Sequence, residues 1–375
     1  MSLSTTLELT NLTRTFNGSE VERYKNELVP RYDHLLEVGR TNWTEHLRLN
    51  QQIGKGGQGV VYLSERRGTD NFTLPVAVKL FSPERYPDAK SYVMAMSRIA
   101  EIASRVAQIQ QDHLLDVYNF IERDRIRLLE MEWIDGFDLG RLLTHEMLEA
   151  VQHRVSAKRW QQINDVIVTP GPVHPRIKPG VAVEVVRECL VALAALHRED
   201  IVHGDIKPSN IMLKRTGSAK IVDYGSAFDV ENPPPQQTCT PRYAAPEVLE
   251  GNSGTQQSDL ASLGYVLIEM LAGRPLFMGF HDLTHLLEAK RALPRVLPEL
   301  LPEEVVVNQM LMAFLRRMIA PDPMRRFPTA EQADLEQETG AAAFHRQLVK
   351  GDLSSEYPNE IRLWLEELKS PVERT

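Results

Sequence analysis

The sequence predicts an α+β protein of two lobes, in which a small antiparallel β-sheet with one helix precedes a larger helical part. The first part contains runs of alternating or β-branched residues, which are typical of strands, and one helical pattern at about 90–111. The strand-like runs are residues 49–53, 60–64, 74–81, 115–121 and 126–132. Beyond Gly136, apolar residues recur at spacings of three or four, most clearly over 181–197, 258–271 and 305–319. Strands first and helices second indicate two lobes with a cleft between them.

The composition is that of an ordinary globular protein, with 375 residues, 42% hydrophobic and 25% charged. A net charge of −8 and the absence of long Lys/Arg runs predict that nucleic acid is not a partner. The start of the chain is unlike a signal peptide, and acidic and basic residues interrupt the longest apolar stretch, 181–196. We therefore expect a cytoplasmic protein without a membrane partner. The two cysteines, Cys189 and Cys239, predict neither a disulfide framework nor a zinc site.

A glycine-rich segment, Gly54–Gly59 (GKGGQG), lies between two predicted strands. Glycines at this spacing let the backbone approach phosphate oxygens closely. The same pattern opens dinucleotide-binding units, but there the glycines lead into a helix. Flanking strands instead favour a β-hairpin flap over a nucleotide, although the segment taken alone is equally compatible with an ordinary turn. Lys79, at the end of an apolar strand, could bind phosphate as a point charge; alone, it is better explained as an exposed strand lysine.

The strongest signal is the segment 202–212 (VHGDIKPSNIM), which places Asp205, Lys207 and Asn210 within six residues. Two further motifs follow it, Asp223-Tyr224-Gly225 and Ala245-Pro246-Glu247.

The order and spacing of these motifs resemble the eukaryotic-type (Hanks-type) Ser/Thr protein kinase family, and the chain is identified as a soluble bacterial member. The resemblance covers residues 49–335 and implies a bilobal protein-kinase-like fold. Its N-lobe would be residues 49–135 and its C-lobe residues 136–335. Residues 1–48 would form an N-terminal extension and residues 336–375 a C-terminal helical extension.

The resemblance implies the reaction and its residues. Asp205 would be the base that accepts the substrate hydroxyl proton, and Lys207 would neutralise charge near the γ-phosphate of ATP. Thr240 would position the hydroxyl substrate, and Lys79 would pair with Glu101. Glu101 is the default choice, because it is the only glutamate between Arg85 and Ile121. Arg105, four residues later on the same helical face, departs from the family, which has an apolar residue there. Asn210 and Asp223 would hold Mg²⁺, with Mn²⁺ as the alternative ion.

The family pattern also implies a nucleotide site. Met131 would be the gatekeeper, and the backbones of Glu132 and Ile134 would meet the adenine. Asp138 would contact the ribose. The complete set of nucleotide-binding residues implied by the resemblance is Ile53, Gly54, Gly56, Gly59, Val61, Ala77, Lys79, Met131, Glu132, Ile134, Asp138 and Met212. Among them, Val61, Ala77 and Met212 would sandwich the ring.

The sequence departs from the family at two positions that matter for control. Gly204 stands where the family has an arginine that binds a phosphorylated activation segment. We therefore predict that activity does not depend on phosphorylation of the activation loop, with Thr238 as the phosphosite if it does. The chain between Asp138 and His203 is longer than a minimal kinase needs. The excess, at about 145–180, is either a surface helix and loop or a docking site for a regulator.

Three functions compete on the sequence alone. A protein kinase acting on Ser/Thr of protein substrates is favoured, because Lys79, Asp205, Asn210 and Asp223 are all present. A pseudokinase serving as an interaction module is the first alternative. A small-molecule kinase is the second, because the tripeptide 203–205 (HGD) is similar to that of aminoglycoside-type phosphotransferases.

Overall fold

The computed structural model describes residues 18–39, 48–68, 70–235, 237–280, 282–349 and 357–368. The rest of the predicted extensions 1–48 and 336–375 lies outside the described residues. The chain divides into two compact units. The N-terminal unit contains the described residues up to Gln110 together with Leu115–Ile134. The C-terminal unit contains Gln111–Leu114 and the described residues from Asp135 onward.

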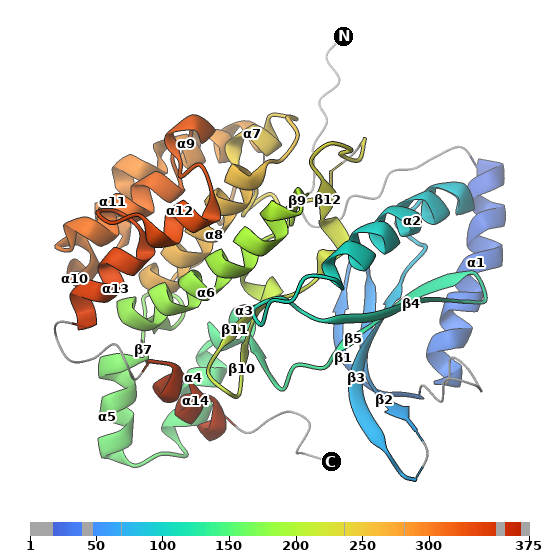
Figure 1. The fold of residues 1–375 in the computed structure, drawn as a ribbon, viewed down its shortest axis with the longest axis horizontal. Coiled ribbons are helices and arrows are strands. Elements are labelled where there is room, and N and C mark those ends of the chain that lie inside the picture. The colour runs from blue at the N-terminus through green and yellow to red at the C-terminus, as the bar shows by residue number, and fades with distance from the viewer. Residues whose placement is uncertain are drawn as a thin grey trace. The chain divides into compact units, whose positions relative to one another are not determined.

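The N-terminal unit is built on a five-stranded antiparallel sheet with the order β1-β2-β3-β5-β4 (Figure 1). Its strands are β1 (Arg48–Gly56), β2 (Gly59–Arg67), β3 (Thr73–Phe81), β4 (Val117–Arg123) and β5 (Ile126–Glu132). The β-branched and apolar residues of β3 explain its central place, since such side chains pack well on a pleated surface. Each predicted strand run lies within or overlaps one of these strands.

Helix α1 (Gly18–Val38) covers one face of this sheet. Tyr32 and Leu35 from the helix join a buried cluster with alternate residues of the strands, including Val78, Leu80 and Leu128. The part of the N-terminal extension that the structure describes therefore belongs to the core of the N-terminal unit.

Helix α2 (Ala89–Val106) follows β3. It begins where the side chain of Asp88 accepts a hydrogen bond from the backbone N–H of Ser91 (2.6 Å), which satisfies one of the unpaired amides of the first turn. The helical pattern predicted to 111 was too long, because the chain leaves the helix in turns after Val106.

The C-terminal unit is mostly helical (Figure 1). Its helices are α3 (Leu139–Leu142), α4 (His145–Gln152), α5 (Ala157–Val166), α6 (Pro179–Arg198), α7 (Pro246–Leu249), α8 (Gln256–Ala272), α9 (Leu283–Leu300), α10 (Glu303–Val306), α11 (Gln309–Met318), α12 (Ala330–Leu335), α13 (Ala341–Val349) and α14 (Tyr357–Glu367). Short 3₁₀ turns lie at η1 (Pro208–Asn210), η2 (Tyr224–Ser226) and η3 (Pro323–Arg325).

Small antiparallel sheets complete this unit. Strands β6 (Gly136–Asp138), β10 (Ile211–Lys214) and β11 (Ala219–Ile221) form the sheet that carries the candidate site, in the order β11-β10-β6. Strand β9 (Ile201–Val202) pairs with β12 (Phe228–Asp229), and β7 (Val168–Thr169) pairs with β8 (Arg176–Ile177).

Helices α6 and α8 form the buried centre of the C-terminal unit, and both were predicted from their apolar pattern. The predicted helix 305–319 is divided into α10 and α11, because the Asn308 side chain accepts a hydrogen bond from the Leu311 N–H (3.0 Å) and starts a new helix. Helix α9 was missed, since Pro294 and Pro298 lie inside it and usually argue against a helix.

The predicted α+β class, an antiparallel sheet in the N-terminal part followed by a mostly helical remainder, is confirmed. Among the helices of the described ranges, none combines the length and the apolar composition needed to cross a membrane.

Candidate active site

The carboxylate of Asp205 is held between two of the predicted catalytic residues in the C-terminal unit. Lys207 Nζ donates to Asp205 Oδ2 (2.6 Å) and to Thr240 Oγ1 (3.0 Å). The hydroxyl and the backbone N–H of Thr240 both donate to Asp205 Oδ1 (2.7 and 3.0 Å). The structure therefore brings the predicted base, lysine and threonine into one hydrogen-bonded group, which positions a carboxylate and a cation side by side.

Asn210 is tied to the same group. Its Nδ2 donates to the backbone carbonyl of Asp205 (2.8 Å), which orients the side-chain amide and leaves its oxygen as an acceptor. The backbone N–H of Val222 donates to the backbone carbonyl of Asn210 (2.9 Å). This bond brings Asp223, the residue after Val222, close to Asn210. Asn210 immediately precedes β10 and Asp223 lies two residues after β11, so both lie at the open end of one hairpin.

Asp223 adopts a left-handed conformation with φ of +68°, which non-glycine residues rarely take. Such strain is typical of functional sites, where the surroundings enforce it. Its Oδ1 accepts from the Gly225 N–H (3.1 Å), and the next residue, Tyr224, is buried with its ring 6.0 Å from that of His203. A carboxylate and an amide oxygen, both hard donors, suit Mg²⁺, which keeps several waters and phosphate oxygens in its shell.

The side chain of Asp259 fixes the backbone of the catalytic loop through hydrogen bonds. This buried carboxylate of α8 accepts from the backbone N–H groups of His203 and Gly204 (2.9 Å each), and it lies 3.0 Å from His197 Nε2. Hydrogen bonds to a charged group are about twice as strong as neutral ones. The loop before Asp205 is thus anchored to the most buried helix of the unit.

Gly204 has a φ of +75°, and a β-carbon at this position would lie 2.9 Å from the backbone oxygen of Ser226. The backbone here therefore suits glycine rather than the arginine of the family pattern. A small cavity lies beside it, lined by residues of β9, the 237–245 segment and α8. Its lining residues in the described chain include Asp259 but neither lysine nor arginine.

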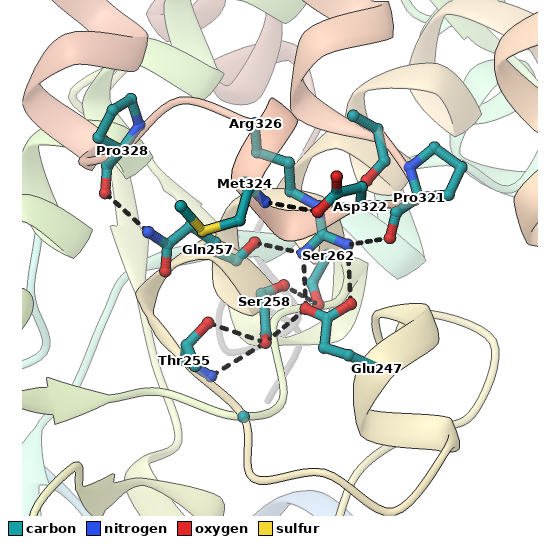
Figure 2. Close-up of polar contacts among 12 residues, drawn as sticks. Glu247, Thr255, Gln257, Ser258, Ser262, Pro321, Asp322, Met324, Arg326 and Pro328 are labelled. Carbon is teal, nitrogen blue, oxygen red and sulfur yellow. Dashed lines mark hydrogen bonds and ion pairs between the residues drawn. The ribbon is translucent and has the colours of Figure 1, made fainter.

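A buried ion pair links the segment after the catalytic loop to the end of the family-like region (Figure 2). Arg326 donates from both terminal nitrogens to the two oxygens of Glu247 (2.6 and 2.7 Å). Ser258 also donates to Glu247 (2.8 Å), and Arg326 donates to the backbone oxygens of Ala320 and Gln257. Although burial opposes its ionisation, Arg326 holds the pKa of Glu247 below its ordinary value.

Two further residues support the segment that contains Thr240, and the sequence did not point to them. Tyr243 donates its hydroxyl to Glu269 (2.9 Å), and the fully buried Lys290 donates to the backbone oxygen of Arg242 (2.7 Å). Burial lowers the pKa of Lys290 well below its usual range. The only sequence signal for this support is Lys290 itself, a lysine among the apolar residues of α9. That helix was not predicted from the sequence.

Four of the predicted nucleotide-binding residues of the N-terminal unit share one face of its sheet. Val61 pairs with Lys79, and Ala77 pairs with Met131 across adjacent strands. Since residues directly opposite and two apart point the same way, all four lie on the face opposite the one that α1 covers. Lys79 is 5% exposed, and its Nζ donates to the Oε1 of Gln58 (2.7 Å).

The glycine-rich segment forms the predicted hairpin between β1 and β2. At Gly59, φ is +142° and a β-carbon would lie 1.8 Å from the backbone oxygen of Leu80, so only glycine fits. Gly54 and Gly56 meet no such obstacle, and Ile53 is 42% exposed.

The remaining predicted residues are placed as follows. Glu101 is exposed on α2, and its pairing with Lys79 stays a prediction. The Glu132 N–H donates to the Asp116 carbonyl (2.9 Å), and Ile134 is buried. In the C-terminal unit, Asp138 pairs with Met212 across β6 and β10. Asp138 caps α3 through the Arg141 N–H (3.0 Å), while burial raises the pKa of its carboxyl.

Comparison with known proteins agrees with this arrangement. The model of the protein kinase domain matches residues 47–336. Serine/threonine-protein kinase PrkC of Bacillus subtilis is 27% identical over 291 residues, which cover 76% of this chain and 39% of that protein. PknA of Corynebacterium glutamicum is 27% identical over 77% of this chain and 55% of its own length. For PknB of Mycobacterium leprae, the identity is 28% over 78% of this chain and 43% of that protein.

The chain thus spans about half, or less, of the length of these curated relatives. All three carry the name of Ser/Thr protein kinases, which confirms the family predicted from the motifs at 202–212 and 223–225. Because the family model matches well over half of its residues, the chain belongs to the protein kinase domain family.

Proposed function

We propose that this chain is an ATP-dependent Ser/Thr protein kinase. The observation that carries the proposal is the hydrogen-bonded group of Asp205, Lys207 and Thr240, with Asn210 tied to its backbone. The substrate hydroxyl oxygen attacks the γ-phosphorus, the bond to the ADP oxygen breaks, and the hydroxyl proton passes to Asp205. Lys207 offsets charge on the transferred group, because such a loose transition state is stabilised mainly by position and charge.

We infer that Asn210 and Asp223 hold the divalent ion that accompanies ATP, with Mg²⁺ preferred and Mn²⁺ as the alternative. The bound ion would supply charge neutralisation at the phosphates. The chain's own contribution is orientation, since Asn210 Nδ2 is fixed on the Asp205 carbonyl and Asp223 is held in a strained conformation. Lys79 and the hairpin around Gly59 would bind the phosphates, and the shared face of Val61, Ala77 and Met131 would receive the adenine.

A protein is the proposed substrate, rather than a small molecule. The Thr240–Tyr243 segment is supported from beneath by Glu269 and Lys290, and Lys207 contacts Thr240 directly. An anchored segment of this kind provides a platform for an extended peptide beside the catalytic carboxylate. A small-molecule kinase has no need of it.

We further propose that the activation segment is ordered without phosphorylation. Thr238 and Ser226 lie within hydrogen-bond distance through their hydroxyls (3.0 Å), and the Gly254 N–H donates to Gln237 (2.9 Å). Strand β12 at the start of the segment pairs with β9. Among the described residues that line the cavity beside Gly204, no lysine or arginine would offset the two negative charges of a phosphothreonine.

The whole-protein organisation is proposed on the same basis. A kinase domain at 49–335 would lie between extensions 1–48 and 336–375, in a cytoplasmic protein, with the insert 145–180 as a regulatory docking site. The described half of the first extension packs on the N-terminal sheet, which supports its reading as part of the functional unit.

The decisive experiment measures transfer of labelled γ-phosphate from ATP to the chain itself and to a generic Ser/Thr protein substrate. Asp205→Asn removes the base while keeping the side-chain volume, so the rate should fall by about 10²–10⁴-fold with an unchanged melting temperature. Free sugars and aminoglycosides serve as competing acceptors. Wild-type protein that binds Mg·ATP but phosphorylates no protein would support the pseudokinase, and transfer to an aminoglycoside would support the small-molecule kinase.

A further inference from the structure

The insert that follows the start of the C-terminal unit is in contact with the last described helix of the chain. Helix α5 of the insert and helix α14 lie side by side, although some two hundred residues separate them (Figure 1). Arg159 of α5 donates from NH1 to Glu360 (2.7 Å) and from Nε to Glu367 (2.8 Å). One guanidinium therefore bridges two carboxylates on the same face of α14, two helical turns apart.

Neighbouring contacts extend this pairing. Gln162 donates its side-chain amide to Glu360 (2.9 Å), and Arg154 donates to the Glu367 backbone oxygen (3.4 Å) at the C-terminal end of α14. A cation at this end of a helix pairs with its unsatisfied carbonyls and with the helix dipole. The side chains of Arg159 and Glu360 are 16% and 8% exposed, so the main ion pair is largely withdrawn from solvent.

Helix α14 also buries a complete apolar face. Ile361, Trp364 and Leu365 are no more than 1% exposed, and Tyr357 is 5% exposed. A helix of eleven residues is marginal in water by itself, so its stability comes from this packing.

Two glycines mark where the chain makes room for α14. A β-carbon at Gly180, at the start of α6, would lie 2.2 Å from the hydroxyl oxygen of Tyr357. A β-carbon at Gly217 would lie 2.0 Å from the backbone oxygen of Pro358, and Gly217 has a φ of +95°. Gly217 lies in the turn between β10 and β11. Asn210 immediately precedes β10 and Asp223 follows β11 by two residues, so both lie at the open end of this hairpin, while α14 packs directly on its turn.

We propose that the insert 145–180 is a docking site for helix α14 of the same chain, and that the docked helix positions the β10–β11 hairpin for metal binding. The occupant is identified by the complementary charges of Arg159 with Glu360 and Glu367, and by the fit of Tyr357 and Pro358 over the two glycines. The insert contacts α14, and α14 contacts the turn of the hairpin that Asn210 and Asp223 flank. The metal-binding part of this proposal rests on the proposed kinase function, whereas the docking part does not.

The test uses the full chain with Arg159→Ala and Glu360→Ala, singly and together. Lys158→Ala on the exposed surface of α5 and Glu366→Ala on the exposed surface of α14 are the matched controls. Arg159→Lys keeps the positive charge but cannot donate to both carboxylates as the planar guanidinium does, so its exchange rate at 357–368 should lie between those of the wild type and Arg159→Ala. This conservative variant also separates loss of the contact from misfolding. Backbone hydrogen exchange is followed at 357–368 and at 211–221, and Mg²⁺ affinity is titrated in the presence of a non-hydrolysable ATP analogue.

We expect Arg159→Ala to speed exchange at 357–368 by at least about tenfold, the change in opening equilibrium that loss of charge-assisted hydrogen bonds implies. Exchange at 211–221 should rise with it, and Mg²⁺ affinity should fall at least about threefold while peptide-substrate KM is unchanged. The effect of the double variant should be smaller than the sum of the two single effects, because Arg159 and Glu360 share one contact, while each keeps a second partner in Glu367 and Gln162.

Unchanged exchange at 357–368, or faster exchange there with the hairpin and Mg²⁺ affinity unaffected, would overturn the proposal. A double variant whose effect equals the sum of the two single effects would also overturn it. If the wild-type chain binds no Mg²⁺ with the nucleotide analogue, the proposed kinase function fails, and the two exchange measurements still decide whether α14 docks on the insert and holds the hairpin.

Discussion

The two units of this chain hold their candidate functional groups in different ways. In the C-terminal unit, the groups hold one another: Asp205 is bonded to Lys207 and Thr240, and Asp259 anchors the loop beneath them. In the N-terminal unit, Lys79 donates to the neutral amide of Gln58, at the tip of a glycine-rich hairpin. In the proposed function, the first region is pre-organised for transfer, whereas the second holds an arrangement that a phosphate would replace.

The difference has a structural cause. The catalytic loop rests on α6 and α8, which are the most buried helices of the C-terminal unit, and the buried side chain of Asp259 fixes its backbone. Gln58 lies instead in a two-residue hairpin tip, where its carbonyl accepts a hydrogen bond from the Ser82 N–H (2.9 Å). A hairpin tip moves at low energetic cost, and this suits a flap that must admit a nucleotide.

Asp223→Ala, in the C-terminal unit, is the substitution from which we expect the largest loss of phosphate transfer. It removes the carboxylate proposed as the main metal ligand, so phosphate transfer should fall by at least about 10²-fold, because a bound metal supplies several kcal/mol of charge stabilisation. Calorimetry with Mg·ATP should show much weaker Mg²⁺-dependent binding. Asp229→Ala, in β12 nearby along the chain, is the control. Unchanged Mg·ATP affinity with persistent transfer would remove Asp223 from the metal site.

A second test asks whether the C-terminal unit depends on its buried ion pair. Arg326→Leu leaves Glu247 buried without its cation, which costs about 3–5 kcal/mol of unfolding free energy. Urea denaturation of the variant should show this loss, and Arg325→Leu, at an exposed neighbouring position, should change stability by less than about 0.5 kcal/mol. If both variants were equally stable, the pair seen in Figure 2 would contribute nothing.

The third test concerns the N-terminal unit. Gln58→Leu removes the Oε1 acceptor that a phosphate must displace from Lys79, so the KM for ATP should fall by about two- to fivefold, the range expected for one neutral hydrogen bond. Gln52→Leu, on exposed surface of β1, is the matched control. A KM that rises instead would show that Gln58 assists phosphate binding and does not compete with it.

The sequence predicted the parts of the site that lie in contiguous motifs. Asp205, Lys207 and Asn210 fall within six residues, so their proximity follows almost from the chain alone, and the structure adds Thr240 from 35 residues later. The sequence could not predict the contacts that depend on packing between segments far apart in the chain. The support of the Thr240 segment by Lys290 comes from α9, whose prolines hid it, and the partner of the insert comes from α14. The bond between Lys79 and Gln58 depends on how a hairpin tip folds over, which no local pattern specifies.

The smallest expected effect concerns Thr238. Its hydroxyl is paired with that of Ser226, and Thr238 lines a cavity whose lining includes Asp259 but no lysine or arginine of the described chain. A phosphate there would meet negative charge, whereas in many kinases of this family it meets arginine. Thr238→Ala removes a single exposed hydrogen bond, so the initial rate on a generic Ser/Thr substrate should change by less than about twofold. Phosphatase treatment of the wild-type chain should likewise leave the rate unchanged, with mass spectrometry confirming that Thr238 carries no phosphate afterwards. Thr216→Ala, which removes another exposed hydroxyl contact in the C-terminal unit, is the control. A tenfold drop in rate on dephosphorylation, reproduced by Thr238→Ala but not by Thr216→Ala, would show that phosphorylation still governs this segment. The catalytic region would then need phosphorylation to reach its active arrangement, just as the hairpin of the N-terminal unit would need a nucleotide. The contrast between the two units would disappear.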